Sequence, residues 1–149
     1  MTLEHIRPML EEALRKAGQP EARYASASTA ELELHGLTVG CEYREGIDSL
    51  VLYCSLGTLP FEPAPSLLEY LLECNLLGKG SGGGHIGLHP QTRILVFSLA
   101  LPAAQLDSSR LANVFDRFAE KAAELITETE ARSYSPLAPS PFMGNVLWA

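Results

Sequence analysis

The sequence predicts an α+β fold in which helices separate the strands of one antiparallel sheet. Apolar residues recur every three or four positions in three segments and every second position in the segments between them. The order that results is helix, three strands, helix, two strands, helix, which is not the strict alternation of a doubly wound parallel fold. We expect one domain over residues 1–132 and a Pro-rich apolar tail over residues 133–149.

The first helix is expected from Leu3 to Gly18. Charged residues separate its apolar positions, and Gly18 and Pro20 end it, because glycine takes the left-handed cap conformation and proline cannot continue a helix. The apolar positions are Leu3, Ile6, Leu10, Ala13, Leu14 and Ala17. The small polar residues 21–30 that follow show no periodicity and are interpreted as a connector.

Three strands are expected next, over residues 31–35, 37–44 and 50–56, with breaks at Gly36 and at Glu45-Gly46. The first two alternate apolar and polar residues. The third is a nearly continuous apolar run, which favours a strand covered on both faces. Short breaks between the three strands indicate an antiparallel meander.

The second helix is expected over residues 67–77, ending at Gly78. Ser66 and Glu69 have the spacing of a capping box at its start. At about 100° per residue, the apolar positions of this helix cover an arc of roughly 220°, about twice what packing on its own sheet requires. About half of the arc therefore needs another partner.

Two further strands are expected over residues 86–88 and 94–101, and the second has the composition of a strand buried on both faces. Pro102 ends it. Asp107 is a suitable N-cap for a third helix, with Leu106 and Leu111 placed as a hydrophobic staple, and this helix fades near Arg132.

Composition limits the partners. The chain has 149 residues with a net charge of -7, and its 11 basic residues are scattered singly, which argues against nucleic acid and anionic membranes. No apolar run approaches the roughly 18 residues that span a bilayer, and Glu4, Glu11 and Glu12 occupy the region where a signal peptide would be basic and then apolar. We expect a cytosolic protein.

No residue pattern predicts catalysis, a metal or a cofactor. Cys41, Cys54 and Cys74 lack CxxC spacing and are interpreted as buried thiols. His85 and His89 lie four residues apart on a strand, about 13 Å, which is too far to share an ion. The glycine-rich residues 78–87 match GxGxxG twice, but a helix precedes them and a strand follows, the reverse of a dinucleotide site. The expected role of this stretch is a helix-to-strand connector.

The chain instead has more apolar surface than one domain can bury: the broad second helix, two doubly apolar strands and the tail. In a soluble acidic protein, such surface commonly marks protein partners. We hypothesise that Phe142 to Trp148 docks on an apolar groove that a protein partner could also use.

The stretch from Leu72 to Phe118 resembles the class I type III secretion chaperones, the family of the Tir chaperones. The pattern comprises Asn75, Leu76, Leu77, Gly82-Gly83-Gly84, Leu88, Pro90, Thr92, Leu95, Leu99, Leu101-Pro102, Leu106-Asp107, Leu111 and Phe118. His89 departs from it, since the family usually has an acidic residue before the turn proline. The tail lies beyond the usual end of the fold.

This resemblance implies a small acidic bacterial homodimer that acts in virulence-related protein transport by holding a secreted effector's N-terminal segment extended, without ATP. The implied dimer interface is Leu68, Leu71, Leu72, Asn75, Val96 and Ser98. The implied partner-binding residues, on the first helix and first strands, are Ile6, Leu10, Leu14, Leu34, Val39 and Tyr43. Strand-edge pairing would add backbone hydrogen bonds to cargo.

Two alternatives remain open. One is a regulatory binding module of the same fold that sequesters a transcription-control partner, which the identity of a co-purifying protein would distinguish. The other is a small enzyme or nucleotide-binding protein that uses the glycine stretch, which a nucleotide-binding measurement on the parent chain and on its Gly82 and Gly83 alanine variants would test.

Overall fold

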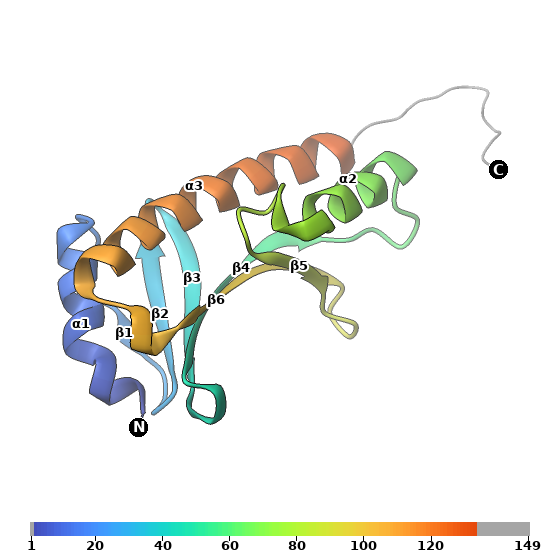
Figure 1. The fold of residues 1–149 in the computed structure, drawn as a ribbon. Coiled ribbons are helices and arrows are strands. Elements are labelled where there is room, and N and C mark those ends of the chain that lie inside the picture. Colours follow the sequence, from blue (N-terminus) through green and yellow to red (C-terminus); the bar gives the residue numbers. More distant parts are fainter. Residues whose placement is uncertain (1, 134–149) are drawn as a thin grey trace, which may run out of the picture.

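The computed structural model describes residues 2–133, and the expected tail, apart from Ser133, lies outside them. Within these residues, three α-helices and six strands form the α+β fold that the sequence predicts (Figure 1). The helices are α1 (Leu3–Lys16), α2 (Pro65–Asn75) and α3 (Ser108–Ser133). The strands are β1 (Arg23–Tyr24), β2 (Thr29–Leu34), β3 (Leu37–Arg44), β4 (Ser49–Thr58), β5 (His85–Leu88) and β6 (Ile94–Pro102).

All strand pairs are antiparallel, and the order across the sheet is β1-β2-β3-β4-β6-β5. The predicted meander is confirmed as β2-β3-β4. The connector expected over residues 21–30 is wrong in part, because Arg23 and Tyr24 form the edge strand β1 and Thr29 and Ala30 begin β2. Two residues are too short to show an alternating pattern.

The helix ends follow local chemistry. Gly18 has a φ of 72°, and the Gln19 N–H bonds the Leu14 carbonyl at 2.8 Å, which confirms the predicted glycine cap of α1. Asp107 accepts the Arg110 N–H at 2.8 Å and caps α3 as predicted. The start of α2 differs from the prediction, because Pro65 occupies its first turn and no capping box forms. Proline begins a helix readily since its φ is already helical.

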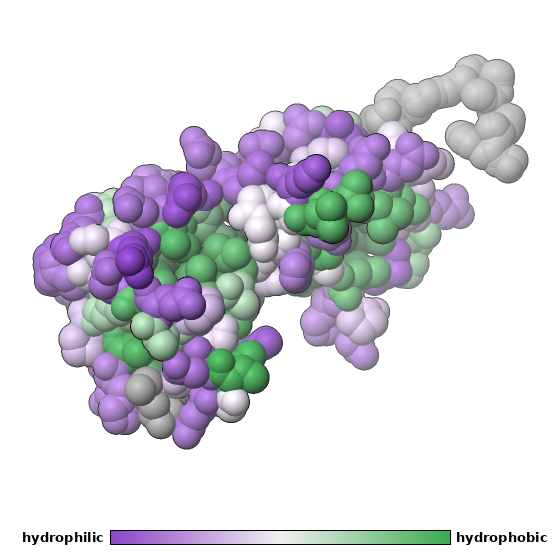
Figure 2. All heavy atoms as spheres, viewed as in Figure 1, coloured by the Kyte–Doolittle hydropathy of each residue, from purple (hydrophilic) through white to green (hydrophobic). Residues whose placement is uncertain are grey.

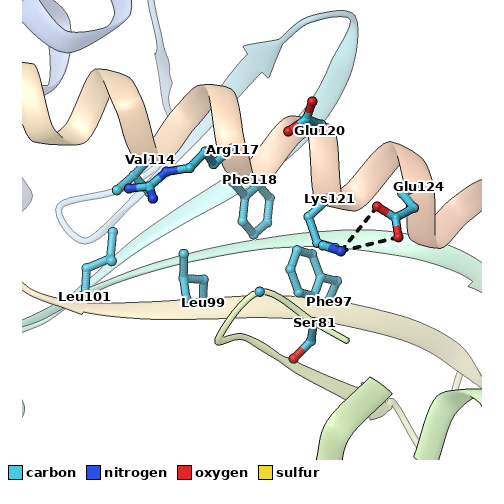
Figure 3. A pocket seen from close by; sticks show the side chains of 11 residues that line it. Ser81, Phe97, Leu99, Leu101, Val114, Arg117, Phe118, Glu120, Lys121 and Glu124 are labelled. Carbon is cyan, nitrogen blue, oxygen red and sulfur yellow. Dashed lines mark hydrogen bonds and ion pairs between the residues drawn. The ribbon is translucent and has the colours of Figure 1, made fainter. Parts of the chain in front are cut away.

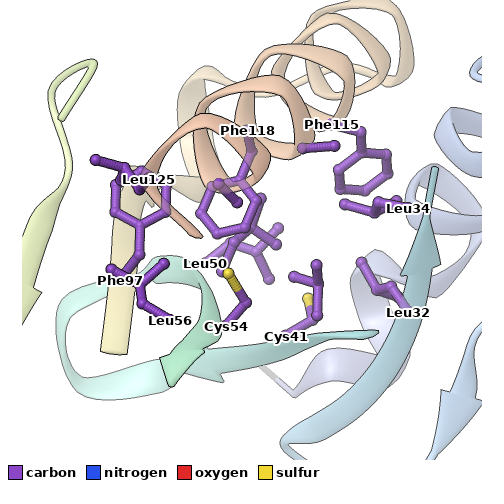
Figure 4. Close-up of a cluster of buried hydrophobic side chains, with 14 of the residues drawn as sticks. Leu32, Leu34, Cys41, Leu50, Cys54, Leu56, Phe97, Phe115, Phe118 and Leu125 are labelled. Atoms are coloured by element: carbon purple, nitrogen blue, oxygen red, sulfur yellow. The ribbon is translucent and has the colours of Figure 1, made fainter. Parts of the chain in front are cut away.

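The core lies between one face of the sheet and the helices (Figure 4). Leu32, Cys41 and Leu52 point into it from adjacent strands, and Phe115 and Phe118 come down from α3. Helix α3 crosses this face, with α1 beside the β1–β2 end and α2 beside the β5 end (Figure 1).

The other face, called here the outer face, carries no described helix. Tyr53 on β4 is 37% exposed, and along β6 the buried Leu95 and Phe97 alternate with the half-exposed Val96 and Ser98. The expectation that both strands are covered on both faces holds only for Ser49 to Leu52 of β4, which are all buried, and is wrong for the rest of β4 and for β6 in the single described chain. Their apolar runs leave uncovered surface instead.

Candidate protein-interaction surfaces

Four exposed leucines cluster at the end of α2. Leu68 and Leu72 lie one turn apart on the helix, and Leu76 and Leu77 follow in a 3₁₀ turn over Leu76–Gly78. Leu72 is 72% exposed and Leu77 is 83% exposed. Figure 2 shows apolar side chains gathered over α2. These four residues are called the α2 surface, and two of them, Leu68 and Leu72, belong to the predicted dimer interface.

The α2 surface is held by contacts on the opposite side of the helix. Leu67, Leu71 and Cys74 are buried against the core. The Arg132 guanidinium lies 4.0 Å from the ring centre of Tyr70 and links α2 to the end of α3. Burial raises the pKa of Tyr70, so this ring stays neutral at ordinary pH. These contacts hold α2 against the rest of the fold while the leucines of the α2 surface face solvent.

Leu77 adopts a φ of 56°, the left-handed conformation that a branched side chain rarely takes. Gly78 follows with a φ of 69°. Together they reverse the chain after α2 while the Leu77 side chain remains outside the core. Backbone strain of this kind is concentrated at functional sites of proteins. The exposed Leu77 side chain is therefore a candidate contact for a partner.

The outer face forms a second, shallower surface. Val51, Tyr53, Val96, Ser98 and Ala100 line a hollow of about 590 Å³ on β4 and β6. Charged and imidazole groups surround it: Glu42, Arg44, His85 and His89. An apolar centre with a polar rim is the usual composition of a protein interface.

The structure separates the predicted dimer-interface residues into accessible and engaged ones. Leu68 and Leu72 are exposed on the α2 surface, and Val96 and Ser98 lie on the outer face. Leu71, by contrast, is only 8% exposed and belongs to the core. The Asn75 side chain binds the backbone of β5. Their part in a dimer stays a prediction.

All six predicted partner-binding residues are buried in this chain's own core. They are Ile6, Leu10, Leu14, Leu34, Val39 and Tyr43. The expectation that these six side chains form an exposed patch for cargo is therefore wrong. An amphipathic pattern identifies the positions that the protein needs for its own core, so a partner would contact the outward neighbours of these residues.

The glycine-rich loop is internally bonded. The Gly83 N–H bonds the Gly78 carbonyl at 2.8 Å, and the Gly84 N–H bonds the Ser81 carbonyl at 3.1 Å. A Cβ on Gly80 would come within 2.7 Å of the Cys74 backbone. The loop runs from the end of α2 to the start of β5, as the predicted helix-to-strand connector does.

The buried thiols have little thiolate character. Burial raises the pKa of Cys41 to about 12 and that of Cys54 to about 11. Within residues 2–133, no three His, Cys, Asp or Glu side chains are grouped so as to hold a metal ion. The same residues contain no helix that is long and apolar enough to cross a membrane.

A groove that no sequence pattern predicts lies between β6 and α3 (Figure 3). It measures about 450 Å³. Its apolar lining is Phe97, Leu99, Leu101, Val114 and Phe118. This β6–α3 groove arises from the crossing of two distant elements, and no local pattern signals it.

Comparison with known proteins gives the same fold. The heterodimeric complex ExoU-SpcU from the type III secretion system of Pseudomonas aeruginosa matches with a TM-score of 0.66 and 15% identity, covering 85% of this chain and 98% of that chain. The HopA1-SchA chaperone-effector complex matches with a TM-score of 0.63 and 15% identity, covering 87% and 98%.

The Yersinia pestis type III secretion chaperone SycH, in complex with a stable fragment of YscM2, matches with a TM-score of 0.60 and 21% identity, covering 80% of this chain and 98% of that chain. Among curated proteins, no sequence matches this chain. A sequence model of the Tir chaperone protein (CesT) family matches residues 9–125, which is most of the chain. The family match and the shared fold agree with the resemblance seen in the residues, and this chain belongs to the Tir chaperone protein (CesT) family.

Proposed function

We propose that this protein is a bacterial cytoplasmic chaperone that binds the extended N-terminal segment of a type III secretion effector. It keeps that segment soluble and hands it to the export apparatus without using ATP. The observation that carries this proposal is the uncovered α2 surface on an acidic member of the CesT family. In this proposal the protein acts by binding alone, as a member of a chaperone family.

The working unit is a homodimer. Two α2 surfaces face each other across a two-fold axis, so that Leu68 and Leu72 of one copy meet the same residues of the other. Val96 and Ser98 on the outer face extend this contact. Leu71 supports it from within the protomer, and Asn75 fixes the end of the helix that carries it.

Cargo binds by adding a strand. Among the described residues, β1 pairs only with Ala30 and Glu31 of β2, so the outer edge of residues 32–34 has no strand partner. Backbone pairing at this edge is independent of cargo sequence, while side-chain contacts select the cargo. Those contacts come from outward positions near α1 and β2, because the inward ones are already used.

A solubility and protection experiment tests the function. Each candidate effector's N-terminal segment is co-expressed with the full chain, and its solubility and protease resistance are measured with and without ATP. We expect a soluble, protected segment in both conditions. Failure of every secreted effector of the host to gain protection would overturn the proposal. Stable binding of a transcription-control protein instead would establish the regulatory alternative.

A further inference from the structure

The β6–α3 groove has Phe97 and Phe118 buried at its floor, and Leu99, Leu101 and Val114 are half-buried along it. The Phe97 and Phe118 rings stack in it with their centroids 4.9 Å apart. A second hollow of about 260 Å³ shares Leu101 and Val114 and continues to Leu106 near the start of α3. The two hollows together run along the N-terminal half of α3.

The rim of the groove is balanced in charge. Arg117 and Lys121 stand beside Glu120 and Glu124, and the Lys121 ammonium lies 3.2 Å from the Glu124 carboxylate. Figure 3 shows this pair over one end of the groove. A rim whose charges cancel favours an uncharged apolar occupant over a charged one.

The strand edge beside the groove is also available. Strand β5 pairs with β6 only over Leu95 to Ser98, so among the described residues the same edge of Leu99 to Pro102 has no strand partner. An extended segment here could bond the β6 backbone while its side chains enter the groove.

The chain's own last residues have the matching chemistry. Residues 134–149 contain no Asp, Glu, Lys, Arg or His, and their apolar side chains are concentrated at the end. These are Phe142, Met143, Val146, Leu147 and Trp148. Pro136, Pro139 and Pro141 precede them and favour an extended backbone.

The length of this segment also fits. At about 1.5 Å per residue, Phe118 lies about 22 Å back along α3 from Ser133. An extended segment as long as residues 134–141 would span about 25 Å at about 3.1 Å per residue. Phe142 can therefore reach the Phe97–Phe118 pair, and the residues after it can follow the groove towards Leu106.

We propose that Phe142–Trp148 docks in the β6–α3 groove of the same chain. A tethered segment has an effective concentration near the millimolar range, so it covers the groove even when its own affinity is weak. Any other polypeptide that uses this groove must first displace it. The inference rests on the geometry of the groove and the reach of the tail, and it does not depend on the proposed effector.

Trp148 reports on docking directly, because it is the only tryptophan of the chain. Its emission and its quenching by acrylamide are measured in the full-length protein. We expect a blue-shifted, protected indole in the parent. Val114→Glu on the α3 wall and Leu101→Glu on the β6 wall should each shift the emission to the red and raise quenching to that of a free peptide of residues 140–149.

Matched controls separate docking from misfolding and from other sites. Ala123→Glu adds the same charge to an exposed position of α3 that does not line the groove and should leave Trp148 protected. Circular dichroism identifies any variant that fails to fold, and the two walls provide independent variants. A solvated indole in the parent, release by Leu72→Glu alone, or protection that disappears on dilution would overturn the proposal.

Discussion

Asn75, at the end of α2, forms two hydrogen bonds with the backbone of Ile86 in the edge strand β5. Its amide nitrogen donates to the Ile86 carbonyl, and its amide oxygen accepts the Ile86 N–H, both at 2.9 Å. The Asn75 side chain thus pairs with β5 through one donor and one acceptor, as a neighbouring strand would, and joins α2 to the sheet. It sets where the α2 surface stands relative to the rest of the fold.

Replacing Asn75 with alanine should lower the free energy of unfolding by about 1–3 kcal/mol, because two hydrogen bonds are lost and the Ile86 groups are left without this partner. Urea unfolding measures the change. Glu73→Ala, at a neighbouring exposed position of α2, is the control and should stay within about 0.5 kcal/mol of the parent. Equal free energies of unfolding for Asn75→Ala and Glu73→Ala would show that the two Asn75–Ile86 hydrogen bonds do not stabilise the fold.

Gly84 and Gly87 form a matched pair for testing the structural role of the glycine loop. A Cβ on Gly84 would lie 2.5 Å from the Ser98 carbonyl oxygen and 2.7 Å from the Phe97 ring, whereas one on Gly87 meets nothing within 4 Å. Gly84→Ala should therefore destabilise by about 1–3 kcal/mol. Gly87→Ala should be neutral or stabilising by up to about 1 kcal/mol.

Thermal unfolding distinguishes the two glycine variants. A neutral Gly84→Ala would mean that β5 can move away from β6 at no cost. In that case, Ser81 and Gly82 of the loop, which line the β6–α3 groove, would not be a fixed wall of it.

The sequence was sufficient for the strongly periodic elements and for showing that the second helix carries unpartnered apolar surface. The apolar arc of the second helix is too broad for one sheet, and Leu72 and Leu77 are exposed accordingly. Periodicity could not show β1, which is two residues long, and it placed the start of α2 late because Pro65 begins the helix.

The contact residues were harder to predict for a physical reason. Alternation and helical period report which side chains face the core, so they selected Leu10 and Val39, which are fully buried. The β6–α3 groove depends on how α3 crosses β6, and Phe97 meets Phe118 only through that crossing. Information of this kind is tertiary and leaves no local trace in the sequence.

Tyr43 and Asp48 give the fold a defined response to alkali. The Tyr43 hydroxyl donates to the Asp48 carboxylate at 2.5 Å across the β3–β4 turn, and this bond, with burial, raises the pKa of Tyr43 to about 12. Since the folded value is above the ordinary value of about 10, the neutral ring stabilises the fold fully below pH 10. That contribution is lost as the pH rises from 10 through 12.

Unfolding by urea between pH 9 and pH 12 checks this sign. The parent should be more stable than Tyr43→Phe at pH 9, and the difference should shrink as the pH approaches 12. A pH titration followed by tyrosinate absorbance should show one fewer tyrosine with a raised pKa in Tyr43→Phe than in the parent. A difference that stays constant over this range would contradict the role given to the Tyr43–Asp48 bond.

Leu72 is the sharpest test of the dimer. It is 72% exposed in the protomer, so Leu72→Glu should change the stability of a single chain by no more than about 0.5 kcal/mol. At a two-fold seam, however, the substitution buries a carboxylate against its own mate. This should cost about 3 kcal/mol or more and weaken dimerisation on the order of 100-fold.

Light scattering over a dilution series measures the change, with Glu73→Gln as the control on the same helix. A dimer of unchanged affinity would place the seam elsewhere, and the outer face around Tyr53 would then be the surface to substitute next.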